Sequence, residues 1–349
     1  MRIDELKAAV EANAQHAADF KTTAADCHYA DNGNGEYGTL IFTQPGNLFS
    51  RDEYQVNPKL NKHAFSQLND RLFGPPTKWI LGDKCPEGLR GKITNRLLEE
   101  YPDKDFFVRV KNTEARAVLS HQYTVFDHTE FVDLVAEALD TAGVKPTVFR
   151  PTIGDFMSTY ILLEAISFGR DPLNHGGGGE GLHPAIYISN SEIGTGAART
   201  MGGLYRSVCE NGVIYGWERE TAQVVIHKHF QRNTLAAIVA AGVIDALKMS
   251  EEAAHKFMAA RDQKIEPQRL DGLIGRWAST YGISVDIKDN WLSNTKTEWH
   301  RSGLEEPTIF DVVNAATYVA HEYSDSPQQR ENVERMAGRI LQGVPWQRE

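Results

Sequence analysis

The sequence predicts an α+β fold with a central, mostly antiparallel β-sheet core, N-terminal helices and a C-terminal helical subdomain. Two observations carry this prediction. Between about residues 146 and 230, β-branched residues recur with period two, in TVFRPTI, FMSTYILLEAI, AIYIS, VIYGW and AQVVIHKHF. After Gln231, helical spacing persists to the end of the chain. We expect a mixed helix/strand region over 1–145, a β-rich core over 146–230 and a helical subdomain over 231–349, in one compact unit.

The N-terminal region alternates between helix and strand patterns. Residues 1–20 have helical spacing, and a second helix over 61–74 ends at a glycine followed by two prolines. A further helix is expected over 88–101. The segments DFFVRVK and ARAVLS are predicted as strands joined by a short turn. A helix over 127–143 has an aspartate at its start and a glycine at its end.

The stretch from Tyr187 to Trp217 is predicted to form a hairpin. Its glycines, at positions 194, 196, 202 and 203, are typical of turns, and Asn211-Gly212 is a strong tight-turn signal. Asn190 and Ser191 are expected to hydrogen-bond the local backbone.

Length and composition indicate a globular protein without a membrane segment. The chain has 349 residues, of which 41% are hydrophobic and 24% charged, enough for one large domain or two modest ones. No apolar run approaches the roughly 20 residues that cross a bilayer, and the polar N-terminus does not resemble a signal peptide. Three widely spaced cysteines suggest free thiols. We therefore expect a cytoplasmic protein of a bacterial host, with no membrane partner.

The charge distribution argues against a wholly basic nucleic-acid binder. The net charge is −10, and the acidic excess lies mainly at the two ends of the chain. Residues 196–232 carry five basic and three acidic side chains. A local basic patch is therefore compatible with the acidic total.

The motifs of common enzymes are absent or incomplete. In IHKHF, His227 and His229 would share one face of a strand and could bind a metal with His183, His175 or Glu192, or they could line a solvent-facing surface. The glycine-rich NHGGGGEGLH fits neither a P-loop nor a dinucleotide-binding turn. Ser191 lacks a nucleophile elbow, and Cys209 is expected to be a structural thiol. We predict no catalytic residues, metal or cofactor.

One combination of residue types favours nucleic acid. Single-strand binders need cations to follow phosphates and flat rings to stack on bases. The segment from 199 to 232 supplies both, in Arg199, Tyr205, Arg206, Tyr215, Trp217, Arg219, Lys228, His229, Phe230 and Arg232. The alternative is an ordinary sheet with core aromatics and solvated arginines.

Three stretches resemble the phage/plasmid-like domain-of-unknown-function family (family number 932). They are ARAVLSHQYTVFDHTEFVDLV, YISNSEIGTGAARTMGGLYRSVCENGVI and TIFDVVNAATYVAHEY, and the resemblance extends over roughly residues 60–340. The tetraglycine insert departs from the family pattern. The resemblance implies no activity and no catalytic residues. It implies an origin on mobile elements, whose genes are commonly linked with DNA replication and recombination.

We therefore expect an oligomeric protein that binds single-stranded DNA and promotes annealing without covalent chemistry. By analogy, oligomeric annealing proteins bind the DNA backbone in a positive groove built from a β-hairpin and neighbouring helices. The expected contact residues share a basic or aromatic side chain: Arg109, Lys111, Arg116, Arg199, Tyr205, Arg206, Arg219, Lys228 and Arg232.

Two other functions remain open at this point. One is a metal- or nucleotide-dependent enzyme that uses His183, Glu192, His227 and His229. The other is a virion or host-takeover protein that acts only through protein contacts.

Overall fold

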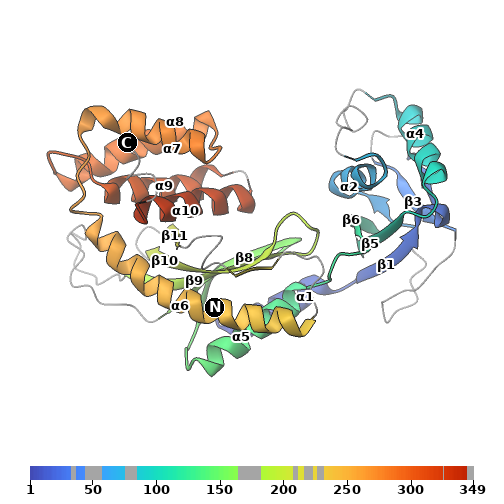
Figure 1. Ribbon diagram of the computed structural model, residues 1–349, viewed down its shortest axis with the longest axis horizontal. Helices are drawn as coiled ribbons and strands as arrows, with labels where there is room; N and C mark the ends of the chain where they lie inside the picture. The colour runs from blue at the N-terminus through green and yellow to red at the C-terminus, as the bar shows by residue number, and fades with distance from the viewer. Residues whose placement is uncertain are drawn as a thin grey trace.

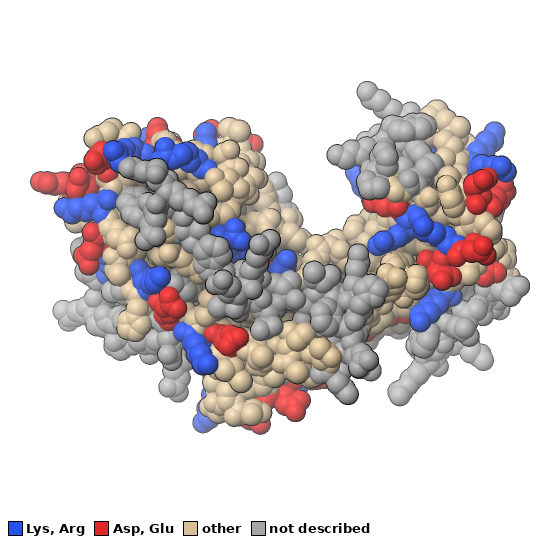
Figure 2. Space-filling view, in the orientation of Figure 1, with Lys and Arg blue, Asp and Glu red and all other residues tan. Residues whose placement is uncertain are grey.

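The computed structural model describes residues 1–32, 37–43, 57–74, 85–163, 182–206, 211–215, 223–225, 232–324 and 326–343. These residues form two lobes at opposite ends of an elongated molecule (Figure 1). We call the part between residues 17 and 120 the N-terminal lobe. The C-terminal lobe combines the first 14 residues with the part from residue 124 onward. The space-filling view shows a hollow between the lobes (Figure 2).

A six-stranded sheet forms the N-terminal lobe. Its strands are β1 (Ala17–Thr23), β2 (Cys27–Ala30), β3 (Thr39–Phe42), β4 (Lys59–Leu60), β5 (Asp105–Lys111) and β6 (Glu114–Ser120). Their spatial order is β1-β5-β6-β4-β3-β2, and β4 pairs with β6 in parallel, whereas the other neighbours are antiparallel. A 3₁₀ turn (Ala24–Asp26) separates β1 from β2.

Two helices, α2 (Lys62–Phe73) and α4 (Glu87–Glu100), close one face of this sheet. Phe65 and Leu98 pack there against Val108 of β5. The side chain of Asn61 accepts a hydrogen bond from the Ala64 amide (2.8 Å) and caps the start of α2. The opposite face of β5 and β6 is also buried, because it meets the C-terminal lobe.

The sheet of the C-terminal lobe is antiparallel throughout. Its strands are β7 (Thr147–Thr152), β8 (Phe156–Leu162), β9 (Leu182–Ser191), β10 (Ala198–Arg206), β11 (Asn211–Tyr215) and β12 (Gln223–Val225). The order is β11-β10-β9-β8-β7, and β12 pairs with the beginning of β10. The helices of this lobe are α1 (Ile3–Ala14), α5 (His128–Thr141), α6 (Arg232–Ala259), α7 (Leu270–Thr280), α8 (Val285–Ser302), α9 (Ile309–Tyr323) and α10 (Pro327–Leu341), with a 3₁₀ turn (Pro267–Arg269) before α7.

The two faces of this sheet differ in chemistry. On one face Ile161, Ile186 and Ile188 form an apolar core with α1, α5 and the first half of α6. On the other face three tyrosines, Tyr160, Tyr187 and Tyr205, lie on three neighbouring strands. The C-terminal helices lie over this tyrosine face (Figure 1).

The C-terminal helices pack around α9, which is buried along nearly its whole length. Thr308 and Asp311 form a capping box that fixes its beginning, with the Asp311 carboxylate accepting from the Thr308 amide at 2.8 Å. Trp291 of α8 donates its indole N–H to the Val312 carbonyl (2.9 Å). Among the described residues no helix is long and apolar enough to span a membrane.

The predicted α+β class is confirmed, with a mostly antiparallel core sheet and a helical C-terminal region. Some local predictions are wrong. The first helix ends at Ala14, and residues 17–20 belong to β1. Asn211 and Gly212 lie within β11, paired with Arg206 and Tyr205, and do not form the turn. The tetraglycine stretch lies outside the described residues.

Candidate functional site: the lobe junction

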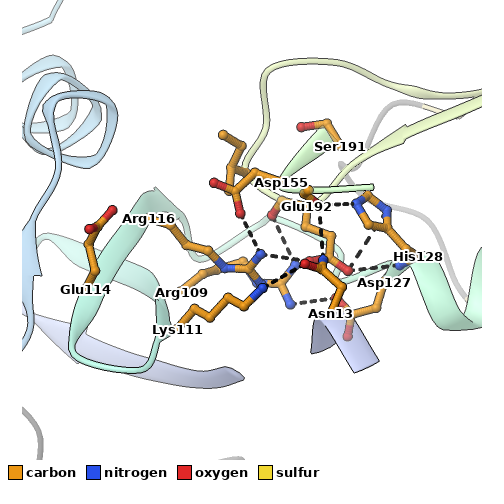
Figure 3. Close-up of polar contacts among 12 residues, drawn as sticks. Asn13, Arg109, Lys111, Glu114, Arg116, Asp127, His128, Asp155, Ser191 and Glu192 are labelled. Atoms are coloured by element: carbon orange, nitrogen blue, oxygen red, sulfur yellow. Dashed lines mark hydrogen bonds and ion pairs between the residues drawn. The ribbon is translucent and has the colours of Figure 1, made fainter. Parts of the chain in front are cut away.

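The two lobes meet at a cluster of buried charges. Arg109 of β5 and Arg116 of β6 project from the N-terminal lobe toward Glu192, which directly follows β9 of the C-terminal lobe (Figure 3). Asp127 and Asp155 complete the cluster, one just before α5 and the other just before β8. The segment from Tyr187 to Trp217, whose pattern suggested only a hairpin, therefore supplies part of the contact between lobes.

Arg109 is almost completely buried, with an exposed fraction of 2%, and each of its three guanidinium nitrogens has an acceptor. It makes a bidentate pair with Asp19 of β1 (Nε to Oδ1 2.9 Å, Nη2 to Oδ2 3.2 Å). It also donates to Asp127 and to the backbone carbonyl of Glu192 (3.0 Å). A buried guanidinium requires such partners, because taking its charge out of water is costly.

Arg116 reaches the junction because of a β-bulge. The β5–β6 ladder pairs Arg109 with Ala117 and Val110 with Ala115, so Arg116 is the extra residue. Its Nη1 atom donates to Asp155 Oδ1 (2.8 Å) and to Glu192 Oε2 (2.9 Å). The bulge thus turns a side chain of the N-terminal lobe onto two carboxylates of the C-terminal lobe.

Glu192 is the centre of the cluster. Its Oε1 atom accepts from the His128 amide at the start of α5 (3.0 Å), and Oε2 accepts from Arg116. Burial alone would raise the pKa of the Glu192 carboxyl, but His128, Arg116 and Arg109 outweigh that effect and hold it below its ordinary value. The carboxylate is therefore ionised at neutral pH.

His128 is held as a neutral imidazole in one tautomer. The Asn190 amide nitrogen donates both to the Phe126 carbonyl (2.9 Å) and to His128 Nδ1 (3.0 Å). Nε2 therefore carries the proton and donates to the Gly154 carbonyl (3.0 Å). Burial lowers the pKa of His128 despite the nearby Glu192 carboxylate. Asn190 therefore bonds residues distant in sequence, which corrects the local bond expected for it; Ser191 does bond locally, accepting from the Thr195 amide (3.1 Å).

Apolar contacts surround the charged cluster. Ile193 packs against Phe107 and Leu119 on the second face of the N-terminal sheet, and its carbonyl accepts from the side-chain Nε2 of Gln67 in α2 (2.9 Å). Gly194 has a φ of +75°, and a Cβ at this position would lie 2.9 Å from Leu119 Cδ2. A glycine is therefore needed where the chain leaves β9 and packs closely against the other lobe.

The arrangement fits a structural contact that fixes the two lobes better than a reactive centre. Both arginines and Glu192 are consumed by mutual pairing, and His128 has both ring nitrogens bonded inside the protein. Within the part of the chain that the structure describes, no group of three or more His, Cys, Asp or Glu residues could hold a metal ion. The cluster therefore joins the lobes in a defined orientation.

These contacts correct the predicted role of two residues. Arg109 and Arg116 were expected to contact a nucleic-acid strand, but both are buried against carboxylates of the protein and are not available to phosphates. Lys111, the third residue predicted in this region, is half-buried, and its ammonium donates to Asn13 Oδ1 at the end of α1 (2.8 Å).

Tyr205 lies inside the protein, and Arg199 is half-buried. Tyr205 is fully buried on the tyrosine face, beside Tyr160 (ring centroids 5.9 Å apart). Arg199 is paired with Glu331 of α10 (3.0 Å). While α10 occupies this face, Tyr205 is inaccessible to a ligand and the Arg199 guanidinium is engaged by Glu331.

The remaining predicted contacts lie at or beyond the ends of described elements. Arg206 is the last residue of β10 and Arg232 the first residue of α6. Arg219 and Lys228 lie outside the described residues, as do His175, His227, His229 and Cys209. On the face drawn in Figure 2, basic and acidic side chains of the described residues are interspersed and do not form a continuous basic stripe.

The predicted enzyme site does not assemble around His183 and Glu192. His183 lies near the beginning of β9, and Glu192 follows its last residue. Nine residues of extended chain separate them by about 30 Å. His183 instead pairs across the sheet with Tyr205.

Sequence reasoning missed the acidic partners, Asp19, Asp127, Asp155, Glu331 and Glu334. A signal for some of them existed: Arg109 interrupts an apolar strand, DFFVRVK, and Arg116 interrupts ARAVLS. An arginine at a buried strand position implies a carboxylate partner. The sequence does not show which carboxylates the fold brings to it.

The comparisons with known proteins identify a family. The model of the family described as "Domain of unknown function (DUF932)" matches residues 115–338. This range includes Arg116, Glu192 and the entire C-terminal sheet, whereas most of the N-terminal lobe lies outside it. No curated protein and no solved structure matches the chain.

Proposed function

The chain belongs to the DUF932 family, and on that premise we propose that it binds single-stranded DNA and promotes annealing through non-covalent contacts, as a homo-oligomer. The observation that supports this most directly is the register of the C-terminal sheet. It pairs β11 and β12 with one strand, β10, which itself carries Arg199 and Arg206.

The register places these segments as follows. β11 pairs with the second half of β10, where Arg206 lies opposite Asn211. β12 pairs with the first half of β10, where Arg199 lies opposite Val224. β11 and β12 therefore follow one another along the same edge of β10, and the chain then enters α6 at Arg232.

The beginning of α6 is chemically suited to an anion. Its first turn contains no acidic residue and begins with Arg232. The unpaired amides at a helix N-terminus carry a partial positive charge that favours phosphate groups. We assign Arg206, Arg219, Lys228 and Arg232 as the phosphate contacts. Arg109 and Arg116 are no longer included, because both are buried in the lobe junction.

The experiment is a titration of a fluorescent oligo(dT) of about 30 nucleotides, followed by anisotropy, at salt concentrations from about 50 to 200 mM. Removing Arg206 and Arg232 together (R206A/R232A) should weaken binding and reduce the slope of log K against log salt by about 1.4, because each phosphate contact on a single strand contributes about 0.7. The matched control is K264A/R269A, which removes two exposed cations that are paired with glutamates in the C-terminal region.

The control should keep the wild-type slope. Equal slopes for the wild type, the control and R206A/R232A would contradict the assignment of these contacts. A duplex of the same length should bind more weakly, because its bases cannot stack on protein side chains.

A further inference from the structure

The tyrosine face of the C-terminal sheet has the composition of a single-strand binding surface, but a helix covers it. Tyr160 of β8, Tyr187 of β9 and Tyr205 of β10 stand side by side, with centroid distances of 5.1 Å between the first two and 5.9 Å between the first and third. Arg199 lies on the same sheet. Aromatic rings on adjacent strands with a neighbouring cation are what unpaired bases and phosphates require.

The helix that covers this face contacts it with two buried carboxylates. Tyr160 donates its hydroxyl to Glu334 Oε2 (2.7 Å), and Tyr187 donates to Glu331 Oε2 (3.0 Å). Arg199 is paired with Glu331 Oε1 (3.0 Å). Both glutamates are nearly inaccessible to solvent, with exposed fractions of 3% and 1%.

Apolar packing alone would not require charged groups here. Glutamate is among the residues least often buried, and burying its charge is costly unless paired. Elsewhere on α10 the buried side chains are apolar: Val333, Met336 and Ala337 pack in the helical core. Arg330, on α10 itself, donates to Glu334 (3.1 Å) and completes the neutralisation of the buried pair.

The contact is not perfectly filled. A small cavity of about 10 Å³ lies between α10 and the sheet, lined by Ser158, Thr159, Tyr160, Tyr187, Pro327, Arg330, Glu331 and Glu334. That volume is about enough for one water molecule. The surface between α10 and the sheet is thus polar, whereas the opposite face of the sheet packs isoleucines in an apolar core.

We propose that α10 is an autoinhibitory element whose Glu331 and Glu334 carboxylates occupy the positions of backbone phosphates, and that single-stranded DNA displaces it from the tyrosine face. This inference rests on the proposed function and specifies its regulation. In the closed state Arg199 is paired with Glu331 and the three tyrosines are buried. In the open state they extend the binding surface from the β11–β12 edge across the sheet.

The test weakens the carboxylate contacts without removing side-chain volume. In E331Q/E334Q the carboxylate paired with Arg199 and the one that accepts from Tyr160 both lose their charge. The open state therefore gains population, and apparent affinity for the oligo(dT) probe should rise about 10-fold or more. The charge-matched control is E298Q/E322Q, which changes two glutamates of α8 and α9 whose ionic partners are Arg301 and His321. It should bind like the wild type.

A second measurement does not depend on any variant. Hydrogen–deuterium exchange of the wild-type protein should become faster in α10 when oligo(dT) is bound, because α10 leaves the sheet. If E331Q/E334Q fails to fold, as judged by circular dichroism, this measurement decides.

The outcomes separate the two proposals. Binding of oligo(dT) by the wild type with unchanged exchange in α10, or with equal affinity for E331Q/E334Q, overturns the autoinhibitory contact and leaves the proposed function intact. Binding by E331Q/E334Q alone supports both. Absence of binding by the wild type and by a folded E331Q/E334Q overturns both.

Discussion

At the scale of single residues, Glu192 is the most constrained side chain of the lobe junction. One carboxylate oxygen accepts from the His128 amide of the C-terminal lobe, and the other accepts from Arg116 of the N-terminal lobe. The exposed fraction of Glu192 is 4%, so water cannot replace a lost partner. The junction therefore depends on a complete set of charges, and removal of one charge leaves the others buried and unpaired.

Replacing Glu192 by alanine should destabilise the fold by about 3 kcal/mol or more, because Arg116 and the His128 amide then lose a buried acceptor. Chemical denaturation followed by circular dichroism measures this. The comparison is E100A, which removes one exposed partner of Arg96 and should cost no more than about 0.5 kcal/mol. A loss for E192A no larger than that for E100A would mean that the junction does not carry the stability assigned to it.

The neutral state of His128 gives the junction a defined pH dependence. The pKa of His128 is lowered in the folded protein, so below about pH 6.5 the imidazole binds a proton in the unfolded chain but not in the folded one. Acidification below that pH should therefore lower the free energy of unfolding of the wild type. Above that pH His128 does not make the free energy of unfolding depend on pH.

The measurement compares wild type with H128Q, whose amide can replace the bonds to Gly154 and Asn190. Between about pH 7.5 and 5.5 the difference in the free energy of unfolding between wild type and H128Q should shrink by about 1 kcal/mol. The other histidines are present in both proteins, so their contributions cancel. An advantage that stays constant or grows on acidification would show that His128 is not held neutral.

At the scale of elements, the approach of α6 to β10 is governed by one glycine. A Cβ on Gly202 would lie 2.6 Å from Met249 Cβ and 2.9 Å from the Ala246 carbonyl oxygen. Sequence reasoning assigned Gly202 to a turn, because glycine is most often a turn residue. In the structure it lies within a strand and allows a helix to pack closely on it.

The substitution G202A should destabilise the protein by about 1–3 kcal/mol, since α6 must move away from the sheet. The matched control is G272A in α7, where a Cβ would meet nothing within 4 Å. That change should stabilise by up to about 1 kcal/mol through helix propensity. Thermal melts of the two variants should therefore shift in opposite directions; a melt of G202A at or above that of wild type would refute the packing account.

Elements with strong local signals were predictable. The strands around Arg109 and Arg116, the helix after Asp127 and the C-terminal helices have periodic apolar patterns that local physics specifies. The beginning of strand β1 was not predictable, because residues 17–20 continue the helical pattern of the N-terminus and only pairing with β5 decides their conformation. Asn211-Gly212 likewise matches a turn locally, but the register with β10 places it in a strand.

At the scale of the whole molecule, tertiary pairing determines which arginines can serve a ligand. From the sequence, Arg109, Arg116 and Arg199 are equivalent to Arg206 and Arg232, since all are cations near aromatic or apolar residues. In the fold they differ, because Arg109, Arg116 and Arg199 are paired with carboxylates between 76 and 132 residues away. Such distant partners leave no local signal, so the basic character of the site could be predicted but its members could not.

The central claim is that this acidic protein binds single-stranded DNA through a local set of cations. The most direct test is the salt dependence of oligo(dT) affinity for the wild-type protein. With four phosphate contacts, log K should fall against log salt with a slope of about −3, so affinity should decrease about 50-fold between about 50 and 200 mM. Absence of binding at about 50 mM salt, or an affinity that does not change across this range, would contradict the account.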